Sequence, residues 1–446
     1  MLQTLKNAFS APDIRRKMIY TLVILLIYRI GCFVPIPGLN LVDTFGQQNG
    51  GNDYDLLAML SMVTGGSLSN GTLFALGIIP FINSFIIMQL LTLIIPKLEK
   101  LSKEGEDGRK KINQYTRYVA IILAVVQAIG VMLSWRGSIT GVFGSEGATD
   151  SSSVNSIFTM ICIVIILTGG SSMVMWLGER ITEYGIGNGT SLIIFIGIVS
   201  SLGNSIWVAL FSTIPSQVRS GDLTGIWFLL GFLVMVVLLF MLIVFVDLSE
   251  RRIPVQYAKQ IKGNKMYGGQ STYIPIKVNS GGVMPIIFAS SLIMFPQMIM
   301  QFVGKTNGFT EFWYEWMGVG SKLYPLFLFL LIIFFAYFYS QIQFNPDDIA
   351  RMIQQNGGFI PGIRPGKSTS DHLRKINNRI TLFGALFLAF VALIPTYILK
   401  INGFATLGFN NAFSATGLLI VVSVALEFEK SLESQLIIKT NKGFLK

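Results

Sequence analysis

The chain has 446 residues, of which 52% are hydrophobic and only 13% are charged, and its mean hydropathy is +0.61. These values exclude an ordinary soluble domain and are typical of a polytopic membrane protein. The formal net charge is +11 at pH 7, so the chain is also basic, and the positions of its cations carry information about topology.

Uncharged apolar runs recur along the whole chain. One helical crossing of a bilayer needs about 20 mostly apolar residues, and the runs lack the alternating pattern of a membrane β-barrel. We therefore predict an all-α polytopic fold with ten transmembrane helices. The predicted spans are Met18–Val34, Leu73–Ile95, Tyr118–Leu133, Val154–Leu177, Ser191–Phe211, Ile226–Val246, Gly282–Val303, Leu323–Gln341, Ile380–Leu399 and Gly408–Leu426.

Lysine and arginine collect in alternate connecting segments. If the N-terminus is cytoplasmic, the inner segments hold 28 of the 34 cations and the outer segments hold five, while Arg29 lies within the first span. Because positively charged short loops stay in the cytoplasm, we expect both termini to be cytoplasmic. The basic segment before the first span lacks a signal-peptide cleavage pattern, so we expect that span to be retained.

Ten spans divide into two halves of five, which we place at residues 1–211 and 212–446. An odd number of spans per half makes the second half enter the membrane from the opposite side, so an inverted repeat is a possible architecture. The halves show no convincing sequence similarity, and the number of spans alone supports this prediction.

The region Leu56–Pro96 carries no charge and is too long for one crossing but too short for two. The sequence GGSLSNG at Gly65–Gly71 divides it into a short apolar helix and a full span. A short apolar helix of this kind is either re-entrant and packed inside the protein or amphipathic and on the surface. Periodicity alone does not separate these two interpretations.

Ionisable residues, which mark the spans of ion-coupled carriers, are nearly absent from the predicted spans. Arg29 is the exception, and we interpret it as snorkelling to the interface or pairing with a lipid phosphate. The only histidine, His372, lies in a basic loop, and neither HExxH nor GxSxG occurs. We therefore expect no catalytic site, metal or cofactor, and we interpret Cys32 and Cys162 as packing thiols.

Three inner segments, of which the second and third are basic, are too elaborate for simple connectors: GERITEYGIGNG from Gly178, RRIPVQYAKQIKGNKMYGGQSTYIPIKVN from Arg251 and GFIPGIRPGKST from Gly358. In the second, alternating polar and apolar residues at Arg252–Lys259 and Ser271–Val278 flank glycines and predict a hairpin. Basic hairpins bind ribosomal RNA phosphates or acidic protein surfaces. The alternative is that the cations only set topology.

The third of these segments contains Gly-Lys-Ser, the end of a nucleotide-binding Walker A loop. That loop needs G-x-x-x-x-G-K-[ST] so that successive backbone N–H groups surround the phosphates. Here Pro361 occupies the first glycine position, and neither it nor Pro365 has an N–H group to donate. We therefore do not expect this loop to bind a nucleotide.

Seven segments, in order and spacing, resemble the SecY family of protein-conducting channels, and the resemblance extends from about Ile14 to the C-terminus. They include FALGIIPFINSFIIMQLL, WLGERITEYGIGNG, RRIPVQYAKQ and NPDDIARMIQQNGGFIPGIRPGK. The outer loops Gly141–Ser153 and Thr306–Gly320 show no resemblance. The resemblance implies two inverted five-helix halves around an hourglass pore, a re-entrant plug helix within residues 55–70 and docking loops at 248–279 and 342–379.

The resemblance also implies roles for individual residues, and Thr190 stands where the family usually has isoleucine. An apolar pore ring falls at Ile78, Ile82, Thr190, Ile194, Ile287 and Ile420. The plug includes Leu57, Met59, Leu60, Met62, Val63 and Thr64. A lateral gate is implied at Gln89 and Asn279. Docking to a motor or ribosome is implied at Arg251, Arg252, Lys259 and Arg364.

The function implied is that of a protein-conducting channel in the bacterial cytoplasmic membrane, which passes unfolded secretory chains across and inserts membrane segments sideways. The implied partners are SecE-like and SecG-like small subunits, the SecA ATPase, the ribosome, signal-sequence-bearing nascent chains and membrane lipid. The chain itself is expected not to be an enzyme. The alternative is a small-solute secondary transporter with inverted repeats, against which stand the missing intramembrane carboxylates and the elaborate inner loops.

Overall fold

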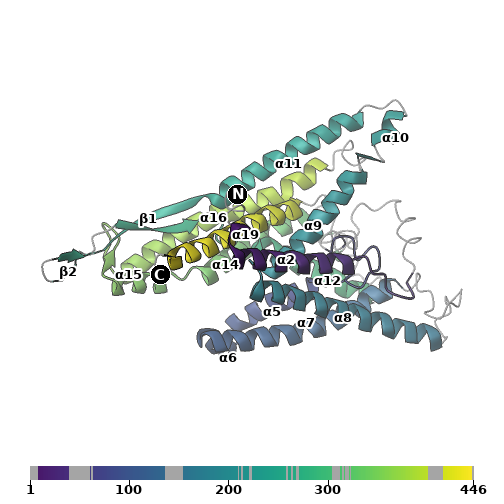
Figure 1. Ribbon diagram of the computed structural model, residues 1–446, viewed down its shortest axis with the longest axis horizontal. Helices are drawn as coiled ribbons and strands as arrows, with labels where there is room; N and C mark the ends of the chain where they lie inside the picture. Colours follow the sequence, from purple (N-terminus) through teal and green to yellow (C-terminus); the bar gives the residue numbers. More distant parts are fainter. Residues whose placement is uncertain are drawn as a thin grey trace. The chain divides into compact units, whose positions relative to one another are not determined.

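In a computed structural model the chain is predominantly helical (Figure 1). It divides into two compact units, each described here by itself. Unit 1 comprises Met1–Leu229, Ser291–Tyr324 and Leu399–Lys446, and unit 2 comprises Leu230–Ser290 and Pro325–Ile398. The structure describes residues 9–39, 61, 64–135, 154–208, 210–211, 214–219, 224–257, 260–262, 265–267, 271–303, 312–313, 316, 321, 323–399 and 415–443.

The predicted halves, 1–211 and 212–446, divide the chain in sequence order and stay a prediction. The helices of unit 1 are α2 (Pro12–Gly31), α5 (Ile79–Ile94), α6 (Pro96–Lys103), α7 (Glu106–Ser134), α8 (Val154–Tyr184), α9 (Gly189–Val208), α10 (Ile214–Arg219) and α19 (Ala415–Gly443). The elements wholly or mostly in unit 2 are α11 (Thr224–Leu248), β1 (Glu250–Tyr257), β2 (Gln260–Lys262), β3 (Lys265–Tyr267), β4 (Ser271–Lys277), α14 (Tyr324–Gln343), α15 (Pro346–Gln355), β5 (Gly358–Phe359) and α16 (Lys367–Leu399). Helix α12 (Met284–Val303) begins in unit 2 and ends in unit 1.

Each of the ten predicted spans coincides with a described helix. Within the described chain, six helices are long and apolar enough to cross a membrane, and α5 with α6 makes a seventh if the bent pair is one span. The remaining three predicted spans fall on α2, α12 and α19, which are not among these candidates. Helix α2 carries charged residues, and the described apolar stretch of α12 is short, Met284–Ile293. The helical membrane fold is therefore as predicted.

The second predicted span starts later than predicted and ends within one residue of the predicted end, both for local reasons. Helix α5 begins at Ile79 instead of Leu73, because Gly77 adopts a φ of +53° and Pro80 fits the first turn of a helix. At the other end, α5 and α6 meet at 101° just before Pro96, where the residue preceding a proline leaves the helical conformation. We call the non-helical stretch 64–78 the turn segment.

Unit 1 is a bundle in which α7 packs against α5 and α8, and α9 packs against α8, α2 and α19. Helices α5 and α7 are tied by the Ser84 hydroxyl, which donates to the carbonyl of Thr116 at 2.6 Å. The turn segment contributes directly to the core. One buried cluster contains Ile36, Leu68, Ala75, Leu76, Ala128, Val131, Met132, Trp135, Ile163 and Leu167.

Unit 2 contains a three-stranded sheet in the order β4, β1, β5. Strand β1 pairs antiparallel with β4, so that Ile253 lies opposite Ile274, and the hairpin predicted between these runs is confirmed. A two-stranded ladder of three residue pairs, β2 with β3, lies beyond the end of β1 (Figure 1). The buried face of the sheet packs on α15 and α16 through Ile253, Val255, Ile276, Ile353, Ile360 and Leu373.

A pair of neighbouring glycines in α8 tests how closely this helix must approach the turn segment. A Cβ atom at Gly170 would lie 2.0 Å from the carbonyl oxygen of Leu73, whereas one at Gly169 would meet nothing within 4 Å. We expect Gly170→Ala to lower the midpoint of thermal unfolding in detergent. Gly169→Ala should leave it unchanged or raise it, because alanine favours a helix over glycine by roughly 1 kcal/mol. Equal midpoints for the two variants would contradict the packing described.

Candidate functional site

The N-terminus of α9 and the start of α5 bring three apolar groups together around Gly178 of α8. A Cβ atom on Gly178 would lie 3.3 Å from Ile193 Cδ1, 3.4 Å from Thr190 Cγ2 and 3.5 Å from Ile78 Cδ1. Ile78 is 3% exposed. Two residues of the predicted pore ring, Ile78 and Thr190, therefore lie beside the same point of α8, with their methyl groups turned towards it.

A hydrogen-bonded cap fixes the orientation of Thr190. The Asn188 side-chain oxygen Oδ1 accepts from the backbone N–H of Thr190 at 3.1 Å and from its hydroxyl at 2.8 Å, which is the arrangement of a helix N-cap. The Thr182 hydroxyl accepts from Gly189 N–H at 2.9 Å and donates to the Gly178 carbonyl at 3.0 Å. The Thr190 hydroxyl is thus engaged by a side-chain amide.

The other predicted ring residues are placed as follows. Ile82 lies one turn after Ile78, whose carbonyl accepts its N–H at 3.1 Å. Ile194 follows Thr190 by one turn and is 5% exposed. Ile420 is 7% exposed on α19, which packs against α9. Ile287 is partly buried on α12 in unit 2. A closed ring formed by all six side chains stays a prediction.

Five of the six named plug residues lie outside the described residues: Leu57, Met59, Leu60, Met62 and Val63. The sixth, Thr64, is described and is 1% exposed. The Thr64 hydroxyl donates to the carbonyl of Ser61 at 3.2 Å.

The two predicted gate residues have different surroundings. Asn279 is 8% exposed, and its Nδ2 atom donates to Asp247 Oδ1 at 2.7 Å, within unit 2. Gln89 lies on α5 in unit 1, and its Oε1 atom is buried without a hydrogen-bond partner among the residues of the structure. A buried amide oxygen without a partner is costly. The role of both residues in a gate stays a prediction.

The predicted docking residues Arg251 and Arg252 are exposed on β1, while Lys259 lies outside the described residues. Arg252 Nε is 2.8 Å from Glu250 Oε1, and its guanidinium carbon lies 4.8 Å from the centre of the Tyr273 ring. The hydrogen bond with Glu250 and the neighbouring Tyr273 raise the pKa of Arg252 above its ordinary value. The side chain is therefore a permanent cation whose ring contact holds it against the sheet.

The loop that carries Arg364 is ordered by its own turns. Gly357, Gly362 and Gly366 have φ values of +69°, +82° and +99°, which favour glycine. The Thr369 hydroxyl donates to the carbonyl of Arg364 at 2.9 Å, and the Arg364 side chain is exposed. The loop thus presents this cation on a defined backbone.

A polar network ties the two helices that flank this loop. Asp347, in the first turn of α15, accepts from the Ser370 hydroxyl at 2.5 Å and from Arg374 Nη2 at 3.1 Å, both in α16. Strand β5 also pairs with the end of β1, with Phe359 opposite Gln256. The structure therefore joins the predicted hairpin and the Arg364 loop into one surface. We call it the docking surface after the role predicted for its arginines, which stays a prediction.

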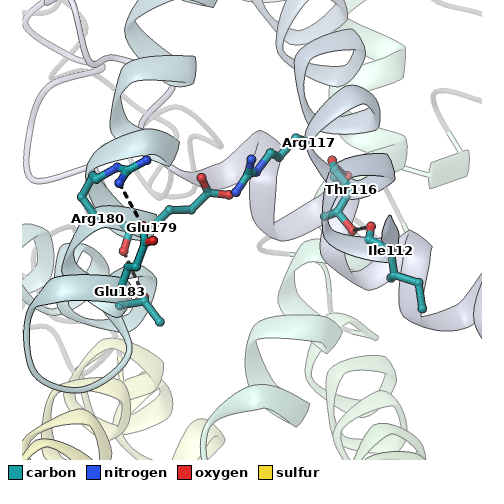
Figure 2. Close-up of polar contacts among 9 residues, drawn as sticks. Ile112, Thr116, Arg117, Glu179, Arg180 and Glu183 are labelled. Atoms are coloured by element: carbon teal, nitrogen blue, oxygen red, sulfur yellow. Dashed lines mark hydrogen bonds and ion pairs between the residues drawn. The ribbon is translucent and has the colours of Figure 1, made fainter. Parts of the chain in front are cut away.

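Figure 2 shows a second group of charges, in the predicted connector Gly178–Gly189 of unit 1, which is helical as far as Tyr184. Arg117 Nε of α7 lies 2.6 Å from Glu179 Oε1 of α8, and Arg180 Nη1 lies 2.9 Å from Glu183 Oε2. The sequence contained no signal for the first pair, because its members are far apart in the chain. The Asn188 cap, in contrast, had a signal in the residue type that precedes α9.

No group of three histidine, cysteine, aspartate or glutamate side chains in the described part of the chain could hold a metal ion.

Comparisons with known proteins give a consistent result. A family model described as SecY matches residues 72–429. Protein translocase subunit SecY of Streptomyces scabiei is 43% identical over 462 residues, and that of Mycobacterium tuberculosis (strain ATCC 25618 / H37Rv) is 40% identical over 460 residues; each alignment covers 100% of both chains.

Two solved structures share the fold. One is described as the structure of a protein conducting channel, with a TM-score of 0.65 and 20% identity, and the other as Sec61 in the canine ribosome-channel complex, with a TM-score of 0.61 and 17% identity. Each match covers 94% of this chain and 91% of the other. At 20% and 17% identity, these two structures support only the fold of this chain, that is, the arrangement of its helices.

The hydrogen bond between Thr190 and Asn188 leads to a prediction. It separates a role of the Thr190 hydroxyl in stability from a role in hydrating the pore. Thr190→Val keeps the branched shape but removes the hydroxyl, so we expect the free energy of unfolding to fall by about 1 kcal/mol. Because the hydroxyl is already engaged by Asn188, the ion conductance of the reconstituted protein should not change. Thermal unfolding in detergent and planar-bilayer recordings measure the two effects. A clear drop in conductance with valine would show that the hydroxyl faces water.

Proposed function

We infer that the chain, which belongs to the SecY family, is the pore subunit of a protein translocase, a multi-pass membrane protein that conducts unfolded chains across the membrane and releases apolar segments into lipid. The observation that carries this conclusion is 43% identity over the full length to a protein translocase subunit SecY. No observation favours a small-solute transporter.

The apolar contacts around Gly178 support a role for unit 1 in closing the pore. Ile78 and the methyl group of Thr190 offer no hydrogen-bond partner to water there, and apolar constrictions exclude water and ions by dewetting. We propose that these residues belong to the constriction together with Ile82, Ile194, Ile287 and Ile420. By the same family resemblance we propose that residues 55–70 form the plug and that Gln89 and Asn279 belong to the lateral gate.

The docking surface supports proposals about partners. Its cations include Arg251, Arg252 and Arg364, all exposed. The loops that carry them belong to the inner segments, which together hold 28 of the 34 lysine and arginine residues. We propose that this surface faces the bacterial cytoplasm, with both termini on the same side, and binds the SecA ATPase or the ribosome. SecA would supply the ATP hydrolysis, since the Gly-Lys-Ser loop is not built for phosphate. SecE-like and SecG-like subunits would complete the complex.

The function is tested by reconstituting the chain with its small subunits in vesicles, adding SecA, ATP and a secretory precursor, and measuring protease-protected precursor. Protection that requires both ATP and the chain is expected. Vesicles that protect no precursor, although the chain is inserted and folded, would overturn the proposed function.

In the same assay, Arg364→Glu should reduce SecA-dependent transport several-fold without changing the unfolding midpoint, because an exposed loop side chain contributes little packing energy. Lys111→Glu, an exposed residue of α7, makes the same change in net charge and serves as the control. Equal transport by the two variants would remove Arg364 from the docking surface.

A further inference from the structure

Arg29 is the one charge well inside a predicted span, and the structure gives it a protein partner. Its Nη1 atom donates to the carbonyl oxygen of Gly65 at 3.1 Å, and its guanidinium carbon lies 4.8 Å from the centre of the Phe33 ring. The side chain is only partly exposed. Because a cation at membrane depth is costly, this position of the guanidinium calls for a functional explanation.

Gly65 and Gly66 form a turn near the start of the turn segment. The N–H of Gly66 donates to the carbonyl of Ser61 at 2.7 Å, and Gly65 and Gly66 have φ values of +69° and +85°. Both glycines therefore adopt the left-handed conformation, which residues with a side chain rarely take. The Gly65 carbonyl lies in this turn, and a cation that donates to it forms a charge-assisted hydrogen bond.

The turn is also wedged between neighbouring elements of unit 1. A Cβ atom at Gly65 would lie 2.9 Å from Arg29 Nη1 and 3.1 Å from the Cα atom of Gly197 in α9. On the other side, the Thr64 methyl group lies 3.1 Å from where a Cβ atom of Gly77 would be. The backbone at Gly65 can occupy this place only without a side chain.

We propose that Arg29 is a positioning residue that latches the Gly65 turn against α2 and α9 and thereby sets the closed, resting state of the channel. The proposal rests on the proposed function, because residues 55–70 are the proposed plug. The latch acts through one charge-assisted hydrogen bond to a neutral carbonyl, and within the described chain no carboxylate is paired with Arg29. Such a contact is strong enough to favour one position and weak enough to be released when a translocating chain enters.

The experiment measures the resting ion leak of vesicles that contain the complete complex without SecA. Arg29→Met keeps an apolar stem and removes the charge, and Arg29→Lys restores the charge. We expect methionine to raise the leak by about tenfold or more, as for the loss of one hydrogen bond to a charged group, and lysine to restore part of the seal. The unfolding midpoint should change little, which a merely structural role would not predict.

Two adjacent glycines provide a matched control. Gly65→Ala and Gly66→Ala impose the same left-handed strain, but the nearest atom to a Cβ at Gly66 is Asn70 Nδ2 at 3.9 Å. We expect only Gly65→Ala to raise the leak. The double variant Arg29→Met with Gly65→Ala should leak no more than the stronger single variant, because both remove the same contact. If Arg29→Met fails to accumulate, the comparison of Gly65→Ala with Gly66→Ala still tests the latch.

The outcomes separate the possible failures. If wild-type vesicles with SecA protect a precursor but Arg29→Met and Gly65→Ala leak no more than Gly66→Ala, the latch is wrong and the proposed function stands. If the effect of Arg29→Met appears only in vesicles with anionic lipid, a lipid phosphate is the partner and the latch is overturned. If no precursor is protected, the proposed function itself fails.

Discussion

A backbone that leaves the helical conformation inside a membrane protein must find its hydrogen-bond partners within the protein, because the bilayer core offers none. The turn segment meets this requirement from both sides. Its Leu73 N–H donates to the carbonyl of Val34 at 2.9 Å, and its Gly71 carbonyl accepts from Ile36 at 3.0 Å. The Ser171 hydroxyl of α8 donates to the Gly77 carbonyl at 3.1 Å. Close approach of α8 and of the stretch that follows α2 is therefore a condition for this segment. Gly31 at the end of α2 and Gly170 in α8 make room for it, because a Cβ atom at either would lie 2.0 Å from Phe74 or Leu73.

The apolar runs and the alternating hairpin were sufficient to predict the type and approximate position of each major element. Both signals depend on many residues at once, so a single exception does not hide them. The end of α5 was predicted to within one residue, but its start was placed just after the Gly65–Gly71 break, whereas Gly77 and Pro80 delay it to Ile79. The turn segment was predicted only as a break, because part of its conformation is fixed by contacts with distant residues such as Val34 and Ser171, which its own sequence does not reveal.

The site was less predictable. Family resemblance placed Ile78 and Thr190 in one ring, but the sequence did not show that Gly178 lies between them or that Asn188 holds the Thr190 hydroxyl. Contacts such as Asn279 with Asp247 join residues far apart in the chain. A polar side chain near a helix end could form a hydrogen bond with many residues of the sequence. Only the packing of the helices determines which of them lies close enough. For the same reason Arg29 was expected to reach lipid.

The ends of the long excursion between α11 and α12 are joined where it leaves the helices. Val278 N–H donates to the carbonyl of Ser249 at 3.0 Å, beside the bond between Asn279 and Asp247. The two helix ends are thus held at a fixed separation whatever lies between them. Such a clasp makes the β1–β4 excursion a modular insert: its tip can be lengthened, shortened or exchanged without changing the register of α11 and α12. Partner preference and membrane architecture can then vary independently in this part of the chain.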